Sequence, residues 1–223
     1  MAEQETEGPM PAVSRRLLLA GLAASPLVFA GCGLLGSSDP LHLAGSKVDT
    51  TIMIIRHGEK PNGSQPGCDE NGHQDPHSLT RRGWARAQAL PKLFDPPKGH
   101  PLVPGLLRPK TIYAATDRGP LAGGHRMRQT VTPLAQQMGI KLDMTFAKSQ
   151  EAALAKAAVA APEPVLICWE HSRISDIVDA LGASDTGVPD EWPDRFDLVW
   201  VFTHAHGKWT FRQIHQRLLP GDS

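Results

Sequence analysis

The chain has 223 residues, of which 40% are hydrophobic and 21% are charged, and its 23 basic and 23 acidic side chains cancel. This composition is typical of a soluble globular protein, and it excludes a collagen-like, disulfide-rich or wholly disordered chain. A length near 200 residues is enough for one domain with a well-filled core. Since the net charge is zero and no basic block is longer than a pair, nucleic acid is not an expected partner.

The first forty residues are predicted to direct export. Arg15 and Arg16 precede an apolar run over residues 17–30, which is too short to span a bilayer because a membrane helix needs roughly 20 residues. Paired arginines before such a run are typical of a twin-arginine signal. The run ends in VFAGC, residues 28–32, which resembles a bacterial lipoprotein box with Cys32 as the lipidated residue. The alternative is a plain signal peptide cleaved nearby, with Cys32 incidental.

These signals divide the chain into a signal peptide over residues 1–31, a flexible tether over residues 32–49 and one folded domain over residues 50–223. We therefore expect a protein of the periplasm or cell envelope that contacts membrane only through its N-terminal lipid. In an oxidising compartment Cys68 and Cys168 either pair or remain free thiols, since a sequence does not supply the geometry. The oligomeric state is left open.

Short apolar runs alternate with helical patterns along the folded domain. The runs that predict buried strands are residues 51–55, 111–115, 165–169 and 196–202. The helices between them are predicted to start after Thr80, near Met127, after Ser149 and after Ser172. This alternation favours an α/β fold, a three-layer α/β/α sandwich with a mainly parallel central sheet.

Three further features refine this prediction. The strands over residues 197–203 and 209–216 are expected to form a hairpin at one sheet edge, with residues 192–196 packing at its entrance. Pro133 is expected to kink or split its helix, because proline lacks an amide N–H. Long loops rich in Pro, Gly, Asn and Asp, residues 60–78 and 95–110, are expected to form a binding rim.

Two predicted strands lead into histidine at their carboxyl ends. The run over residues 51–55 continues into Arg56 and His57, and the run over residues 165–169 leads to His171. Ligands of open α/β sheets bind beyond the carboxyl ends of the strands. Both histidines therefore lie where a site is expected.

Arginines accompany these histidines. Arg56 ends the first strand, and Arg126 starts the helix that follows the strand over residues 111–115. If the strands are neighbours, two arginines and two histidines converge, and a phosphate dianion is the natural occupant of such a cationic pocket. Gly58 lets the backbone come close to a ligand, and Ser172 is expected to head a helix whose free N–H groups favour an anion.

Four blocks, in this order, resemble the histidine phosphatase superfamily, which includes phosphoglycerate mutase-like enzymes and acid phosphatases. The blocks are Arg56-His57-Gly58 with Glu59, the stretch from Leu79 to Leu90 with Gly83 and Arg86, Arg126 with Gln129 and Thr130, and the strand that leads to His171. The resemblance spans residues 50–182 and implies a phosphoglycerate mutase-like fold. A longer loop than the family's leaves Arg118 as a rival for the second arginine, and we favour Arg126 because Gln129 and Thr130 follow it at the family spacing.

The resemblance implies a phosphatase that needs no metal or cofactor and acts on a small phosphorylated substrate. His57 would attack phosphorus in line and form a phosphohistidine, which water then hydrolyses. Arg56, Gly58, Arg126 and protonated His171 would bind the phosphoryl group throughout.

The leaving group also needs a proton, and in this family the acidic donor varies in position. Glu59 is our candidate because it stands two residues from His57, with Asp117, Glu151 and Glu170 as alternatives. In the other interpretation Glu59 only neutralises the arginines.

Two other functions remain open from the sequence. A lipid-anchored binding protein would keep the fold and the phosphate pocket without turnover. A metal-dependent hydrolase would use His204 with His206, or Cys68 with His73 and His77. No tetrahedral ligand spacing is evident, so we expect no metal.

Overall fold

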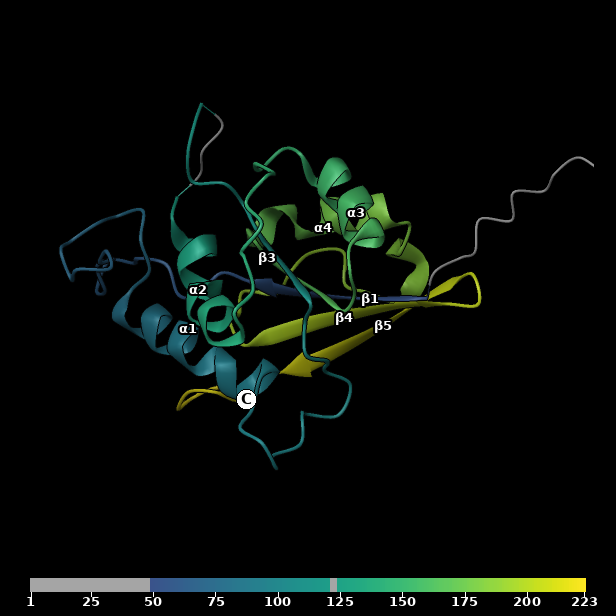
Figure 1. Cartoon of the computed structure of the whole chain (residues 1–223). Helices are drawn as coiled ribbons and strands as arrows, with labels where there is room; N and C mark the ends of the chain where they lie inside the picture. The colour runs from purple at the N-terminus through teal and green to yellow at the C-terminus, as the bar shows by residue number, and fades with distance from the viewer. Residues whose placement is uncertain (1–48, 121–123) are drawn as a thin grey trace, which may run out of the picture. The chain divides into compact units, whose positions relative to one another are not determined.

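The computed structural model describes residues 49–120 and 124–223. The predicted signal peptide and most of the tether, Cys32 included, lie outside the described residues. The described part contains a five-stranded sheet in the order β2-β3-β1-β4-β5 (Figure 1). Its strands are β1 (Thr50–Arg56), β2 (Thr111–Ala114), β3 (Val165–Trp169), β4 (Leu198–Ala205) and β5 (Lys208–His215).

The sheet has a parallel part and an antiparallel part. Strand β3 lies parallel to β1 on one side and to β2 on the other. Strand β4 pairs antiparallel with β1, and β5 pairs antiparallel with β4. The predicted edge hairpin is thus confirmed, but its turn is shorter than expected, since only His206 and Gly207 separate the two strands, both at positive φ (50° and 78°). Two residues of this conformation match the twist of paired strands.

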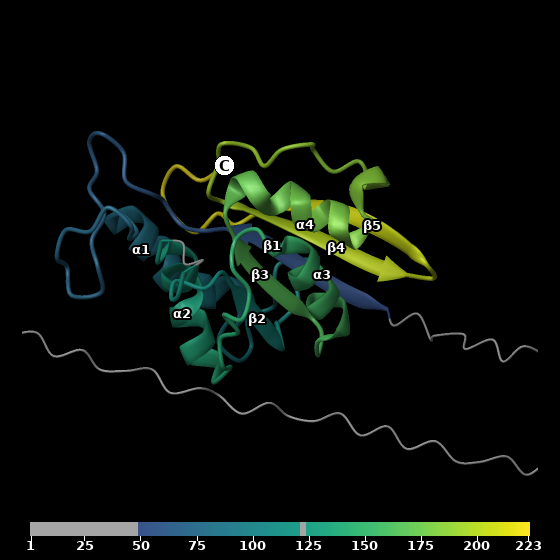
Figure 2. The ribbon, with the colours of Figure 1, turned by 90° about the horizontal axis from the view of Figure 1, so that it is seen from above.

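Two pairs of helices cover the sheet on opposite faces (Figures 1 and 2). Helices α1 (Arg81–Phe94) and α2 (Arg126–Met138) pack together, and α3 (Glu151–Ala160) packs with α4 (Ile174–Leu181). The predicted α/β/α sandwich is therefore confirmed. Among the residues described, no helix has both the length and the apolar character that crossing a membrane requires.

The starts of the helices follow the sequence only in part. Thr80 caps α1 as predicted, its Oγ1 accepting a hydrogen bond from the Gly83 amide at 3.2 Å. Pro133 does not split α2, which runs unbroken across it. The predicted serine caps are wrong, because Gln150 precedes α3 and the residue before it, Ser149, has a φ of +81°. Ser172 lies inside a short 3-10 helix ahead of α4, so it does not cap that helix either.

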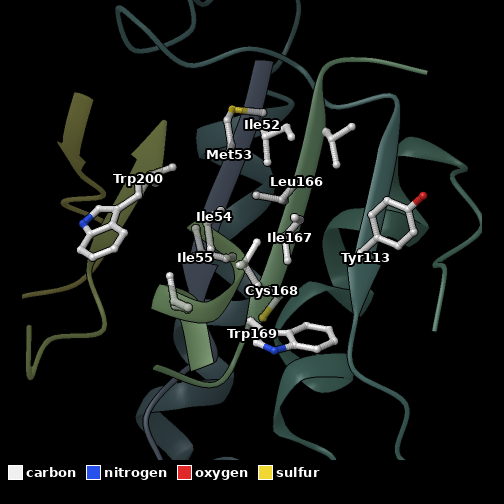
Figure 3. Packing of buried hydrophobic residues seen from close by; sticks show 14 of the residues in the cluster. Ile52, Met53, Ile54, Ile55, Tyr113, Leu166, Ile167, Cys168, Trp169 and Trp200 are labelled. Carbon is white, nitrogen blue, oxygen red and sulfur yellow. The ribbon is translucent and has the colours of Figure 1, made fainter. Parts of the chain in front are cut away.

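Apolar side chains of β1 and β3 fill the space between the layers (Figure 3). Ile54 and Ile167, which are neighbours in the parallel ladder, are fully buried. Burying one such side chain stabilises the fold by ~1.5–3 kcal/mol, so the strands hold their carboxyl ends in fixed positions. Cys168 is buried in β3 and Cys68 lies in the long loop, and both are free thiols.

Candidate active site

His57 directly follows β1, and the backbone around it sets the state of its ring. Its amide N–H donates to the carbonyl oxygen of Trp169 on the neighbouring strand at 3.1 Å. Its Nδ1 lies 2.7 Å from the carbonyl oxygen of Gly58. Because a carbonyl oxygen can only accept, Nδ1 carries the proton and Nε2 keeps its lone pair. The ring is therefore prepared as a neutral nucleophile.

The surroundings of His57 also favour the neutral ring. The residue is 2% exposed, and this burial is the main cause that lowers its pKa to about 3. The hydrogen bond to Gly58 acts in the opposite sense, whereas the charges of Arg126, Arg56 and His171 lower the pKa further. Two guanidinium groups and a second imidazole thus lie close enough to act on one ring. The structure thus brings together the residues that the sequence predicted to converge.

Arg56 is held from one side of its guanidinium group. Its Nη1 donates to Asp194 Oδ1 at 3.1 Å and to the carbonyl oxygen of Arg195 at 3.3 Å. The ring of Phe196 packs against it, with 3.9 Å between Cζ and the ring centroid, and the same ring lies beside His57. The buried Nε has no partner within the described residues. Nε therefore remains available to an oxyanion, which arginine binds through paired N–H groups.

Arg126 starts α2 and is held in the same manner. Its Nη1 donates to the carbonyl oxygen of Pro76 at 3.1 Å, while its buried Nε has no partner in residues 49–120 and 124–223. The first turn of α2 is bonded to the nucleophile segment, because the Gly58 amide donates to Thr130 Oγ1 at 2.8 Å. The rival, Arg118, lies exposed in the loop between β2 and α2. The charge of Arg126 acts on His57, which supports Arg126 over the exposed Arg118 as the second arginine of the site.

His171 follows β3 and completes the cluster. Burial, Arg56 and Lys60 lower its pKa, although Glu170 and Asp194 act in the opposite sense. The free protein thus favours a neutral His171 near neutral pH. A bound dianion would stabilise the protonated ring, because an opposite charge nearby favours the charged form.

The buried, unpartnered nitrogens of the described side chains all belong to this cluster. They are Arg56 Nε, Arg126 Nε and His171 Nδ1. A buried polar group without a partner costs ~1–3 kcal/mol, so such atoms indicate a ligand that supplies the missing bonds. A phosphoryl group offers several charged acceptor oxygens and fits a pocket of this charge. The arrangement can bind a phosphoryl group beside a neutral imidazole.

Two of the candidate proton donors are engaged in structural contacts. Asp117 accepts from Arg128 Nε at 2.5 Å, in an ion pair at the start of α2. Glu151 is buried, and its Oε1 accepts from Trp169 Nε1 and from the Ser149 amide, both at 3.0 Å. Neither carboxylate is hydrogen-bonded to Arg56, Arg126 or His171.

The other two candidates, Glu59 and Glu170, differ in what surrounds them. Both carboxylate oxygens of Glu59 accept from Arg86, and Arg82 adds a further bond at 3.0 Å. Glu170 is paired with Lys148 at 2.7 Å and is half-buried. Burial raises the pKa of Glu170, but Lys148 and the charges of the phosphate cluster lower it overall. Glu170 thus acts on Arg56, Arg126 and His171, whereas Glu59 acts on Arg56 and is bonded to α1.

Sequence reasoning underestimated residues 192–196, which were expected to pack at the entrance of a strand, with lining of the substrate pocket as the lesser alternative. The structure uses Asp194, Arg195 and Phe196 to fix Arg56. The Arg56–Asp194 contact spans 138 positions of sequence, so no local spacing could have indicated it.

The alternative metal site is not formed by the described side chains. Within residues 49–120 and 124–223, no three His, Cys, Asp or Glu side chains cluster closely enough to hold a metal ion. His204 instead packs against Trp209, with 5.0 Å between ring centroids. His73 lies 3.3 Å from Asp69 in the long loop.

Comparison with known proteins gives structural relatives only, since no family model and no curated protein matches the chain. A mycobacterial glucosyl-3-phosphoglycerate phosphatase is 12% identical with a TM-score of 0.45, over 77% of this chain and 100% of that one. A phosphoserine phosphatase from Entamoeba histolytica is 17% identical with a TM-score of 0.45, over 76% and 100% of the two chains. The alpha-ribazole phosphatase from Shigella flexneri is 13% identical with a TM-score of 0.42, over 78% and 100%. The geometry of the site therefore has to carry any argument about function.

Proposed function

We propose that this protein is a metal-independent phosphatase that hydrolyses phosphomonoesters through a phosphohistidine intermediate on His57. The observation that carries the proposal is the 2.7 Å contact of His57 Nδ1 with the Gly58 carbonyl oxygen. It leaves Nε2 unprotonated in a ring that Arg56, Arg126 and His171 surround. A neutral nucleophile within a cationic pocket is the combination that phosphoryl transfer to histidine requires.

The first step transfers the phosphoryl group to the enzyme. His57 Nε2 attacks phosphorus in line, and the bond from phosphorus to the ester oxygen breaks with its electron pair leaving on oxygen. Arg56 and Arg126 bind the equatorial oxygens, where charge accumulates in the transition state. Uncatalysed hydrolysis of such esters is among the slowest of known reactions, and enzymes accelerate it by up to ~10²¹-fold, so dense preorganised charge is needed.

The second step returns the enzyme to its starting state. Water attacks the phosphohistidine and gives a proton to the carboxylate that protonated the leaving group. The N–P bond breaks with its electron pair returning to Nε2, and inorganic phosphate leaves. The Gly58 carbonyl holds the proton on Nδ1 throughout, so Nε2 recovers its lone pair when the bond breaks.

For the proton that the leaving alkoxide takes up, we favour Glu170. Its charge acts on Arg56, Arg126 and His171, which supports a role beside the proposed phosphate pocket. Lys148 stabilises its ionised form in the free protein. A phosphoryl dianion bound nearby would raise the pKa of Glu170 and favour the protonated acid.

The test is turnover of a chromogenic aryl phosphate by the full chain, with and without EDTA. We expect turnover that survives EDTA, disappears in His57→Ala and persists in His206→Ala, a matched change in the exposed hairpin turn. Brief incubation followed by an alkaline quench should show alkali-stable, acid-labile phosphate on histidine in the wild type. Phosphate binding without turnover would favour the anchored binding protein instead, and EDTA-sensitive turnover would favour the metal-dependent hydrolase.

We also propose that the protein is exported and that Cys32 carries a lipid. The VFAGC motif after the apolar run supports this proposal. Mass spectrometry of the mature N-terminal peptide tests it, since lipidation adds acyl chains to Cys32, and an unmodified N-terminus at another residue would contradict it.

A further inference from the structure

Glu59 belongs to a buried ion network beside the nucleophile. Its side chain is 11% exposed, and Oε1 accepts from Arg82 Nε at 3.0 Å and from Arg86 Nη2 at 2.8 Å. Arg86, 2% exposed, also donates from Nη1 and Nη2 to Asp222 at 3.0 and 2.9 Å. The network therefore joins the segment after β1, helix α1 and the segment after β5.

Within this network, Arg86 and Asp222 have pKa values that are shifted toward the charged form of each side chain. Burial raises the pKa of Asp222, but hydrogen bonds from Arg86 and from the amides of Leu218 and Leu219 lower it to about 2. The carboxylates of Glu59 and Asp222 together raise the pKa of Arg86 against the effect of its burial. Arg86 thus bridges the side chains of Glu59 and Asp222.

The backbone of Glu59 is also fixed by contacts with the start of α1. Its carbonyl oxygen accepts from the Thr80 amide at 2.9 Å and from Thr80 Oγ1 at 3.2 Å. A Cβ atom on Gly83 would lie 2.7 Å from that carbonyl oxygen and 2.9 Å from the Glu59 amide nitrogen. The first turn of α1 therefore packs directly on Glu59, and only glycine fits at position 83.

These contacts bear on the ring of His57 through one peptide unit. The carbonyl that accepts from His57 Nδ1 belongs to Gly58, and the amide plane containing it also contains the nitrogen of Glu59. An imidazole without this acceptor can carry its proton on Nε2. In that tautomer Nε2 has no lone pair with which to attack phosphorus. Whatever fixes the peptide between Gly58 and Glu59 also fixes the reactive tautomer.

We propose that Glu59 is a positioning residue, which the Arg86–Asp222 pair anchors so that the Gly58 carbonyl keeps the His57 proton on Nδ1. In this role Glu59 accepts hydrogen bonds from cations and never transfers a proton to the substrate. The catalytic consequence rests on the proposed function, whereas the tautomer of His57 can be measured without it.

The experiment compares Glu59→Ala with Glu59→Gln in the full chain labelled with ¹⁵N-histidine, the His57 signals being assigned by their loss in His57→Ala. We expect the wild type to show a protonated Nδ1 and Glu59→Ala to show a mixture of tautomers. Turnover of an aryl phosphate should fall about 10- to 100-fold in kcat with little change in KM, as when a group supporting a reactive residue is lost. Glu59→Gln keeps an acceptor oxygen for Arg86 and should recover most of both properties.

A proton-donor role for Glu59 predicts a different pattern, in which Gln fails as badly as Ala and the tautomer is unchanged. That result, or an active Glu59→Ala with an unaltered tautomer, overturns the proposal.

Arg82→Gln removes one bond from Glu59 at a partly exposed position and gives a milder form of the same test if Glu59→Ala does not fold. Asp95→Ala breaks the exposed ion pair with Arg108 and should change neither readout. A wild type with the expected tautomer but no activity on any phosphate would reject the proposed function alone.

Discussion

Arg56 and Arg126 are held alike, although they come from different elements, β1 and α2. Each donates from Nη1 to a main-chain carbonyl oxygen, that of Arg195 at 3.3 Å and that of Pro76 at 3.1 Å, and each leaves a buried Nε without a partner in the described part of the chain. A guanidinium group fixed at one end loses little side-chain freedom when its other nitrogens bind an oxyanion. The two loops that supply these carbonyls are therefore part of the phosphate pocket.

This relationship predicts that lysine cannot replace either arginine. Arg126→Lys keeps the charge but loses the planar fork, so we expect kcat/KM on an aryl phosphate to fall about 10²- to 10³-fold, as when one transition-state donor is removed. Arg118→Lys is the matched control, because Arg118 lies exposed in the neighbouring loop. An equal loss of kcat/KM in Arg118→Lys would identify Arg118 as the second arginine that binds phosphate.

For an aryl phosphate, whose leaving group departs readily without a proton, the pH dependence follows from the two histidines. Burial and nearby cations lower the pKa of His171 below its usual 6.5, and only the protonated ring holds the phosphoryl group. For the free enzyme, kcat/KM should therefore fall as the pH rises through that lowered pKa. The acid side should stay active until His57 is protonated, with a pKa of about 3. Rates from pH 3 to pH 9 test this, and a flat profile up to pH 9 would contradict it.

Lys60 offers a directed test of the same assignment. It is exposed, and its charge is among the causes that lower the pKa of His171. Lys60→Met should therefore move the descending limb of kcat/KM to higher pH, while His171→Asn should abolish that limb. A limb that stays in place in Lys60→Met would mean that another group produces it.

Helix α2 shows what could be predicted from the sequence. Gln129 and Thr130 follow Arg126 at a spacing that places all three on one face of the helix. The structure uses Thr130 to bind Gly58 and Gln129 Oε1 to accept from the Leu79 amide at 3.0 Å. The buried strands were equally clear, because continuous apolar runs need cover on both faces of the sheet. Local patterns of this kind fix the elements and the residues at their ends.

Contacts between distant segments could not be read in the same way. The choice of Glu59 as proton donor depended on its closeness to His57 in sequence, whereas its surroundings are set by Arg86 and Asp222. Ser149 was expected to cap α3 from its type alone, but its backbone has a φ of +81° and its amide donates to Glu151 Oε1. For Glu59 a tertiary contact decided between alternatives that the local sequence left equal, whereas for Ser149 the backbone conformation decided.

The assignment of Glu170 as acid predicts a dependence on the leaving group. An aryl oxide leaves readily without a proton, whereas an alkoxide does not, so Glu170→Gln should slow alkyl phosphates by about 10²-fold or more and aryl phosphates much less. The ratio of the two kcat values is the measurement. Asp117→Asn serves as control, since Asp117 is engaged by Arg128. An unchanged ratio in Glu170→Gln would remove that residue from the reaction.

A final prediction concerns stability, because the cationic cluster carries a cost when no anion is bound. Buried unpartnered nitrogens and like charges destabilise the free protein, so Arg126→Gln should raise the free energy of unfolding without phosphate by ~0.5–2 kcal/mol. Inorganic phosphate binds the folded state and should stabilise the wild type by ~2.7 kcal/mol at 100 times its dissociation constant. Phosphate should stabilise Arg126→Gln far less than it stabilises the wild type.

The two thermal unfolding curves should therefore cross as phosphate is added. Without phosphate the variant should unfold at a higher temperature than the wild type, and at saturating phosphate the wild type should unfold at the higher temperature. Such a reversal is expected where residues that preorganise a binding site lower the stability of the free protein. Sulfate at equal ionic strength separates recognition of the anion from screening of charge. If phosphate raises both midpoints equally, Arg126 does not bind the phosphoryl group, and the pocket described here is not the phosphate site.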